Sequence, residues 1–119
     1  MNKSFRQDRL NETIKEFLSE LLLSGVKDPR IGLVTITAVK VSQDLMTAKV
    51  YYSVMGTEEE RQASQDGLKS AGNFLRKTLG RELKLRYSPE LHFVYDDSLD
   101  RAIAIEEALR EAKKKTEDD

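Results

Sequence analysis

Apolar residues near the N-terminus recur every three or four positions, which predicts a first helix over residues 4–24. The positions that share this face are Leu10, Ile14, Phe17, Leu18, Leu21 and Leu22. Ser4 is a candidate N-cap and Gly25 a candidate stop. Residues 26–31 contain Pro29 and predict a loop, because proline lacks an amide hydrogen and disfavours helix before it.

Two runs of β-forming residues follow and together predict a β-hairpin. Residues 33–42 are rich in β-branched side chains, with apolar residues on both faces, as in a well-covered strand or a strand with a bulge. Residues 46–54 alternate cleanly. Gln43 and Asp44 form the turn between them, and residues 91–95 predict a short third strand.

The second helical region opens with a capping box, because Thr57 is followed three residues later by Glu60. Its apolar face consists of Leu68, Leu75 and Leu79. Gly72 interrupts the pattern, since glycine is a poor helix former. We therefore predict a break or kink at residues 70–72, a second helix from there to about residue 79, and a stop at Gly80.

The remaining elements define the fold class. After a basic connector at residues 81–89 and the third strand, Asp96, Asp97 and Ser98 offer N-cap groups for a final helix. The order helix, strand, strand, helix, helix, strand, helix predicts an α+β fold, with one three-stranded sheet covered on one face by helices. We assign residues 1–109 to a single domain and residues 110–119 to a charged C-terminal tail that frays.

Composition removes several classes of protein. The 119 residues fit one domain, and the absence of Cys excludes a disulfide scaffold, a Cys-ligated zinc site and a thiol nucleophile. A single His excludes a His-rich metal site. No apolar run approaches the ~20 residues that span a bilayer, and the N-terminus lacks the apolar centre of a secretory signal. We therefore expect a cytoplasmic protein without a membrane partner.

The formal net charge of −1 hides an asymmetry. Residues 69–86 hold six basic residues and one acidic residue, whereas residues 96–119 hold five basic and nine acidic residues. Glu58, Glu59 and Glu60 form a second acidic block. The basic segment can hold a phosphate backbone, or it can be a solvated helix face that only keeps the protein soluble.

Catalytic chemistry finds little support. His92 has no Cys partner and lies in a predicted strand, which favours a structural histidine. Asp96, Asp97 and Asp100 could hold a divalent metal, but their place before a helix favours capping. No Walker loop, GxGxxG or GxSxG is present. We therefore expect no enzyme, no cofactor and no small-molecule substrate.

Nucleic-acid binding explains the basic segment better. On a helical wheel Lys69, Asn73, Arg76 and Lys77 share a flank beside the leucine face, so one side can pack on a sheet while another meets phosphates. The predicted helix start at Ala71 and Gly72 would offer free amides and close backbone approach. Further cations are Arg81, Lys84 and Arg86 in the connector, and Arg6 and Arg9 in the first helix.

The aromatic residues favour recognition of backbone and shape. Tyr51 and Tyr52 are neighbours in a strand and point to opposite faces, so no aromatic stacking row forms. We therefore expect contacts to phosphates and shape more than readout of single bases.

Several separated stretches resemble the bacterial ribosome-binding factor A family, in the right order and over nearly the whole chain. They are Asp28-Pro29-Arg30-Ile31-Gly32, VTITAVKVS, Asp44-Leu45, AKVYYSV, LKSAGNFLRKTLG and LKLRYSPELHFVYDDSLDRAIAI. The resemblance implies a K-homology-like domain of the second type, α-β-β-α-α-β, in which an Ala-x-Gly kink replaces the usual GxxG loop. Ser70, Ala71 and Gly72 occupy that place, with Ser70 where Ala is usual.

The resemblance also implies RNA-binding residues and a function. The candidates are Arg6, Arg9, Lys69, Ser70, Ala71, Gly72, Asn73, Arg76, Lys77, Arg81, Lys84 and Arg86. The implied role is binding of the free 30S small subunit and 16S rRNA by a monomer, late in subunit maturation. It includes processing of the 5′ end of 16S rRNA and a link to cold adaptation. The alternative is a protein-interaction module whose acidic helices dock a ribosomal protein or an assembly GTPase.

Overall fold

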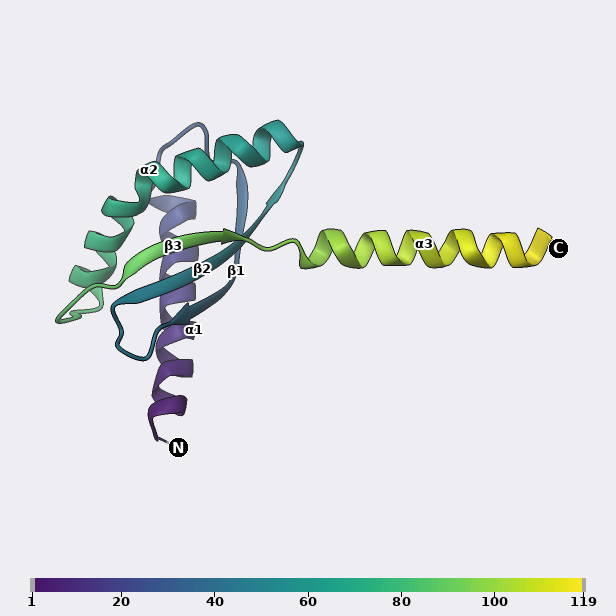
Figure 1. Ribbon diagram of the computed structural model, residues 1–119. Coiled ribbons are helices and arrows are strands. Elements are labelled where there is room, and N and C mark those ends of the chain that lie inside the picture. The colour runs from purple at the N-terminus through teal and green to yellow at the C-terminus, as the bar shows by residue number, and fades with distance from the viewer. Residues whose placement is uncertain (1, 119) are drawn as a thin grey trace.

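The computed structural model describes residues 2–118 as three helices and three strands (Figure 1). The elements are α1 (Asn2–Ser24), β1 (Leu33–Val41), β2 (Thr47–Met55), α2 (Glu58–Glu82), β3 (Glu90–Tyr95) and α3 (Ser98–Asp118). The predicted positions of the first helix, the hairpin, the third strand and the final helix are confirmed within a few residues. Helix α1 begins at Asn2, so Ser4 lies inside the helix and not before it.

The predicted capping box forms at the start of α2, and a second side chain bonds the backbone in the loop after α1. The Thr57 hydroxyl accepts a hydrogen bond from the Glu60 amide at 3.2 Å, and the Glu60 carboxylate accepts one from the Thr57 amide, which completes the capping box. In the loop after α1, the Asp28 carboxylate accepts a hydrogen bond from the Arg30 amide at 2.9 Å. These bonds satisfy backbone groups that the helix and the turn would otherwise leave free.

The sheet has the order β1-β2-β3. Strands β1 and β2 form the antiparallel hairpin, while β3 pairs parallel with β2, so α2 is the crossover that a parallel pair requires. The register shifts between Ile36 and Ala38, and this irregularity explains the imperfect alternation of the first strand.

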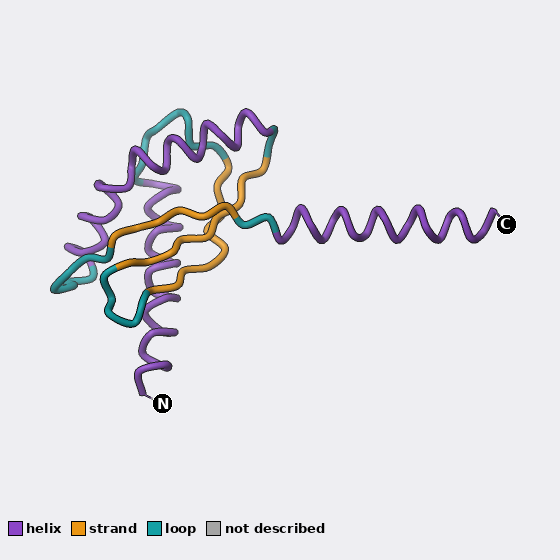
Figure 2. The backbone as a smooth tube through the Cα atoms, in the orientation of Figure 1, coloured by secondary structure: helices purple, strands orange, loops and turns teal. Residues whose placement is uncertain are grey.

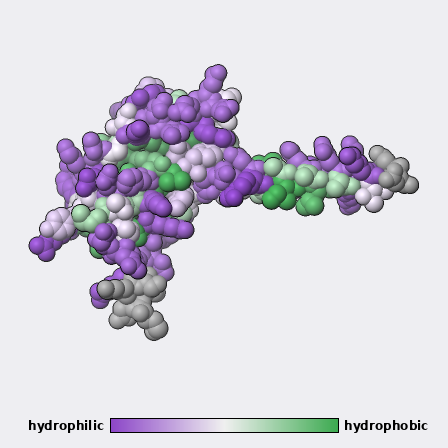
Figure 3. Space-filling view, in the orientation of Figure 1, coloured by the Kyte–Doolittle hydropathy of each residue, from purple (hydrophilic) through white to green (hydrophobic). Residues whose placement is uncertain are grey.

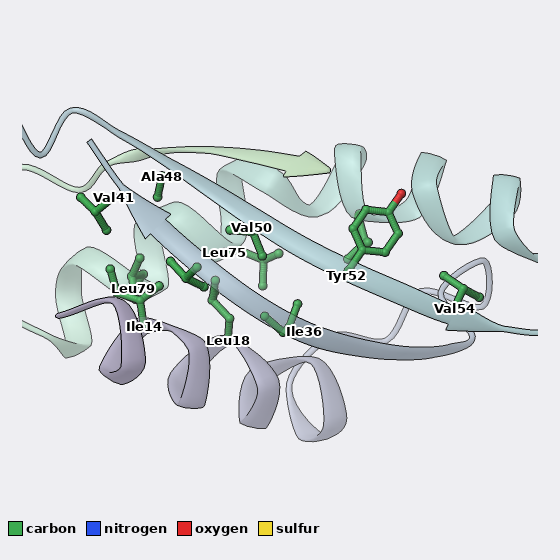
Figure 4. Packing of buried hydrophobic residues seen from close by; sticks show 12 residues of the cluster. Ile14, Leu18, Ile36, Val41, Ala48, Val50, Tyr52, Val54, Leu75 and Leu79 are labelled. Atoms are coloured by element: carbon green, nitrogen blue, oxygen red, sulfur yellow. The ribbon is translucent and has the colours of Figure 1, made fainter. Parts of the chain in front are cut away.

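Helices α1 and α2 cover one face of the sheet, and the core lies between these helices and the sheet (Figure 4). Alternate residues of β2 are buried on this face, and Tyr52 at the centre is 1% exposed. The other buried apolar residues are Ile14, Leu18, Ile36, Val39, Val41, Ala48, Val50, Val54, Leu68, Leu75 and Leu79. Each fully buried large apolar side chain stabilises the fold by about 1.5–3 kcal/mol. The predicted packing of helices on one face is confirmed.

The predicted division of the second helical region into two helices is wrong. Helix α2 is continuous from Glu58 to Glu82, although its axis bends midway (Figure 2). Gly72 in a helix interior costs only about 1 kcal/mol relative to Ala. The fully buried Leu68, Leu75 and Leu79 lie on both sides of Gly72 and hold both halves of the helix on the core. The predicted break at residues 70–72 is therefore a bend within α2 and not the end of one helix and the start of another.

Helix α3 projects away from the body of the domain (Figure 1). Its first turn is fixed, because Asp100 accepts hydrogen bonds from Tyr95 at 2.9 Å and from Arg61 at 3.3 Å. Beyond that turn, the described side chains up to residue 116 are exposed. The helix includes residues 110–118, and residue 119 lies outside the described residues. The fraying of residues 110–119 stays a prediction, which rests on the tendency of an unpacked helix end to open independently of the body.

Candidate nucleic-acid interface

The predicted cationic flank of α2 lies on the side of the helix that faces away from the core. Lys69, Asn73, Arg76 and Lys77 are all exposed, whereas the leucine face of the same turns is fully buried. The helical repeat places the two sets on different sides, as the wheel predicts. One side of α2 is therefore committed to the core, and the other presents cations to solvent.

Of residues 70–72 only Ser70 is exposed, since Gly72 is partly buried and Ala71 packs against the core, and the three residues offer no helix N-terminus. Because α2 is continuous, the backbone amides of Ala71 and Gly72 belong to its internal hydrogen-bond ladder, and the predicted free amides are wrong. What remains is steric access, since a Cβ built on Gly72 would meet no atom within 4 Å. Ser70 is exposed beside it. A phosphate backbone can therefore approach α2 closely at Gly72 without forming amide contacts there.

The connector after α2 is held against the helix. The Ser88 hydroxyl donates to the Arg76 carbonyl at 2.7 Å, and Arg76 Nε donates to the Ser88 carbonyl at 3.1 Å. Gly80 permits this approach, because a Cβ there would lie 2.8 Å from Ser88 Cβ. Lys84 sits in the left-handed region at φ 53° and turns the chain out of the helix. Arg81 lies in the last turn of α2 and not in the connector as predicted, and Lys84 and Arg86 extend the charge of α2 on a fixed support.

We call these exposed side chains of α2 and the connector the basic surface. Its members are Lys69, Asn73, Arg76, Lys77, Arg81, Lys84 and Arg86. The pairing of Arg81 with Glu82 at 3.5 Å offsets part of the charge, although both side chains are largely exposed and such pairs are weak. Arg76 differs from its neighbours, because its guanidinium also holds the connector.

Arg6 and Arg9 are exposed on a different helix. Between them, Gln7 Nε2 donates to the carbonyls of Val41 and Ser42, so this part of α1 lies against the end of β1. The connector reaches the same end of the sheet, where the Glu90 amide donates to the Met46 carbonyl at 2.8 Å. Arg6 and Arg9 therefore lie on α1, at the end of the sheet that the connector also reaches.

Two exposed aromatic residues on this surface were not among the sequence candidates. Phe74 is 49% exposed on the outer side of α2, and Tyr87 is 66% exposed in the connector. The Arg86 guanidinium carbon lies 5.6 Å from the centre of the Tyr87 ring. Phe74 carried a signal, because it falls well away from the leucine face on the wheel, whereas a lone Tyr in a loop carries none. Both rings add stacking surface next to cations.

The carboxylates before α3 have structural partners. Asp96 accepts hydrogen bonds from the Ser98 amide at 2.9 Å and from the Thr37 hydroxyl at 2.7 Å, which agrees with capping. Hydrogen bonding from the Ser98 side chain, and then from Thr37, lowers the pKa of Asp96 to about 2. Asp97 pairs with Arg101 at 3.1 Å. Within residues 2–118, no group of three or more His, Cys, Asp or Glu side chains is arranged to hold a metal ion.

The only histidine is exposed on the strand that was predicted to contain it. His92 lies on β3, its side chain is 51% exposed, and its Nε2 is 3.8 Å from the Glu90 carboxylate. No described helix has the length and apolar content to cross a membrane.

The architecture defines the class of this protein. If the two halves of the bent α2 are counted separately, the order is α-β-β-α-α-β followed by the additional α3. This is a K-homology-like domain of the second type, and its sequence contains no GxxG. A family model described as Ribosome-binding factor A matches residues 6–109. The chain belongs to the ribosome-binding factor A family.

Individual relatives agree over most of the chain. Ribosome-binding factor A of Geotalea uraniireducens is 45% identical over 114 residues, 96% of this chain and 93% of that protein. The crystal structure of ribosome-binding factor A from Thermus thermophilus gives a TM-score of 0.66 at 28% identity, covering 75% of this chain and 94% of that chain. A Thermus thermophilus ribosome-binding factor A fitted into a cryo-EM map of a 30S complex gives 0.62 at 28% identity, covering 73% and 91%.

Proposed function

We propose that this protein is a ribosome assembly factor that binds the free 30S subunit through 16S rRNA. It assists late maturation of the subunit and processing of the 5′ end of 16S rRNA. The observation that carries the proposal is the basic surface, which presents cations from a fixed helix and a fixed connector. The family supports the choice of target, because a Thermus thermophilus member has been fitted into the map of a 30S complex.

The mechanism needs binding alone. A factor that binds one rRNA conformation more tightly than another shifts the population towards it, by no more than the difference in affinity. The basic surface supplies contacts to phosphates, which position the protein, while the shape of the bent α2 selects the RNA geometry. We propose a cytoplasmic monomer that acts without covalent chemistry, cofactor or small-molecule substrate.

Sedimentation with ribosomal particles tests the proposal directly. The purified protein is centrifuged with small subunits, large subunits and assembled ribosomes at low and moderate salt. We expect co-sedimentation with free small subunits only, and weaker binding at the higher salt because counterions released from RNA oppose binding. Absence of binding to every particle would remove the proposed function and leave the fold and family intact.

Two charge variants with the same net charge locate the interface. Lys69→Gln with Lys77→Gln removes two cations of the basic surface, and Lys113→Gln with Lys114→Gln removes two cations of α3. Both changes take the formal net charge from −1 to −3. The first variant should bind small subunits more weakly, and its plot of log affinity against log salt should be shallower by about one to two units.

The α3 variant should bind like the native chain, and both variants should melt like it. We chose Lys69 and Lys77 because Arg76 also holds the connector, so its removal would mix charge with structure. If both variants lose affinity equally, binding depends on net charge and not on the basic surface.

The alternative is docking on a basic ribosomal protein or an assembly GTPase through the acidic helices. The exposure of α3 favours it, because Leu99, Ile103 and Leu109 are 62%, 47% and 66% exposed on a helix rich in acids (Figure 3). Removing residues 110–119 separates the two functions. Loss of small-subunit binding in this truncated chain would favour the protein partner, whereas unchanged binding would favour RNA.

A further inference from the structure

The face of the sheet opposite α1 and α2 is not covered by any described helix. Along β2 the pleat sends Ala48, Val50, Tyr52 and Val54 into the core and the intervening residues to this open face. Lys49 and Met55 are exposed there, and Tyr51 is partly exposed. A sheet face that is open to solvent usually carries scattered polar residues, so an ordered row of like side chains on it needs an explanation.

A row of basic side chains crosses the open face from strand to strand. Lys40 of β1 lies directly opposite Lys49 of β2, which in turn lies opposite His92 of β3. All three side chains are exposed. Like charges directly opposite in a sheet destabilise it. The pair Lys40 and Lys49 therefore works against the isolated fold, and a bound anion between the two strands would remove that repulsion.

Tyr51 stands next to this row on the central strand. Its partners across the sheet are Ala38 and Val94, whose side chains are shorter than that of Tyr51. Lys40 Nζ lies 5.6 Å from the centre of the ring. Proteins bind single-stranded nucleic acids with an aromatic ring beside a flexible cation, so that a base stacks on the ring and a phosphate pairs with the cation.

The cationic end of this face adjoins the basic surface. Lys40, Lys49 and His92 lie where β1 ends and where β2 and β3 begin. The connector that carries Arg86 and the exposed Tyr87 runs directly into β3. At the other end of the face the exposed pair is apolar, Leu33 opposite Met55. A strand of RNA that follows the connector can thus continue onto the open face, where it passes the exposed Glu90 at the start of β3 before it reaches Lys49 and Lys40.

We infer that the open face of the sheet is a second RNA contact, in which Tyr51 stacks on an unpaired base while Lys40 and Lys49 hold the flanking phosphates. The inference rests on the proposed function for its choice of RNA, and it adds an unpaired segment to the helix-borne contacts of the basic surface. Lys40 leaves the Tyr51 ring for a phosphate as the base takes its place.

The ring is tested with a short, fluorescently labelled oligouridine, whose binding is followed by anisotropy. Tyr51→Leu keeps an apolar side chain but removes the ring, and it should weaken binding by about five- to 100-fold, as loss of one base–aromatic stack does. Tyr51→Phe keeps the ring and should bind like the native chain. Met55→Leu, on the same strand and face but at its apolar end, should also bind like the native chain.

The lysines provide a readout that a structural role would not give. Lys40→Gln and Lys49→Gln should each weaken oligouridine binding and reduce its salt slope by about 0.7 units. Each should leave thermal stability unchanged or raised, because the cross-strand repulsion disappears. Loss of binding together with loss of stability would mean that the lysines act on the fold, and would overturn the inference.

The outcomes separate this inference from the proposed function. If native protein binds small subunits but Tyr51→Leu binds oligouridine as tightly as native protein, or native protein does not bind oligouridine, the open face is not an RNA contact. If native protein binds no ribosomal particle but its oligouridine binding depends on Tyr51, the proposed function fails and the contact stands. Binding of oligoglutamate that is lost in Tyr51→Leu, without binding of oligouridine, would replace RNA with an acidic protein segment.

Discussion

At the scale of single residues, the junction between the sheet and α3 depends on one carboxylate. Asp96 receives the Thr37 hydroxyl from the irregular part of β1, and its amide donates to the Tyr52 carbonyl of β2 at 2.6 Å. The same carboxylate caps the first turn of α3 through the Ser98 amide. Asp96 therefore joins two strands to the helix that leaves the domain, and it does so in the ionised form.

This arrangement predicts a pH-dependent stability. The pKa of Asp96 falls from 3.8 to about 2, so its contribution is fully present above pH 3.8 and is lost as pH falls through about 2. Asp96→Asn should lower the free energy of unfolding at neutral pH, and the difference from native protein should shrink between pH 3.8 and about 2. Urea unfolding followed by circular dichroism measures this difference.

Asp97→Asn is the control for that series. Asp97 lies in the same turn and forms an exposed pair with Arg101, so its replacement should change stability by at most about 1 kcal/mol at any pH. A difference between Asp96→Asn and native protein that stays constant over the acid range would show that the ionised form of Asp96 is not what stabilises the junction.

Residue-level signals in the sequence succeed where the chemistry is local. The Thr57 capping box, the Asp96 cap and the opposite directions of Tyr51 and Tyr52 all follow from spacing, and all are confirmed. Tyr87 could not be found in this way, because its exposure and its contact with Arg86 depend on how the connector folds against α2. The membership of the RNA-binding set stays a prediction.

At the scale of elements, α2 shows how packing overrides a local preference. Its two interior glycines meet different surroundings, although both lie in regular helix. Gly67 is buried against the loop before β1, and a Cβ there would lie 2.6 Å from Ile31 Cγ1, whereas a Cβ on Gly72 would meet open space. Gly72 thus weakens the helix without serving contacts within the described fold, while Gly67 allows α2 to pack.

The two glycines give a matched pair of substitutions. Gly67→Ala gains about 1 kcal/mol of helix propensity but forces a clash that costs about 1–3 kcal/mol, so it should destabilise the protein. Gly72→Ala should stabilise the protein by about 0.5–1 kcal/mol, since it adds propensity without a clash. Thermal unfolding of both variants measures the two effects.

Binding of Gly72→Ala to small subunits tests whether Gly72 serves RNA binding or the shape of α2. If close approach at Gly72 matters, Gly72→Ala should bind small subunits more weakly although it is more stable than native protein. If instead Gly72→Ala is less stable than native protein, the glycine is needed for the bend of α2. Close approach of RNA to the open space at Gly72 would then not be the reason for a glycine at this position.

At the scale of the whole molecule, the fold gathers the charged blocks of the sequence into an acidic region at one end of the sheet and a basic region towards the other. The pair of Arg61 and Asp100 brings the acidic start of α2 beside the start of α3, while the basic surface extends towards the opposite end of the sheet. Spacing could predict each block, but not their grouping, because the grouping depends on the parallel pairing of β3 with β2 and on the path of the connector. The cationic row on the open face was hidden for the same reason.

The projection of α3 gives the molecule an unusual size for its length. A compact domain of 119 residues has a radius of gyration of about 13–14 Å, whereas this chain has 17.9 Å. Small-angle X-ray scattering should give a radius of gyration near 17.9 Å for the full chain. The radius of gyration should fall to about 12–13 Å when the residues after Asp97 are removed. A full-chain value near the compact figure would mean that α3 folds back onto the domain. In that case its apolar residues would be covered by the domain itself, and the acidic helix would be a poor candidate for docking a separate protein.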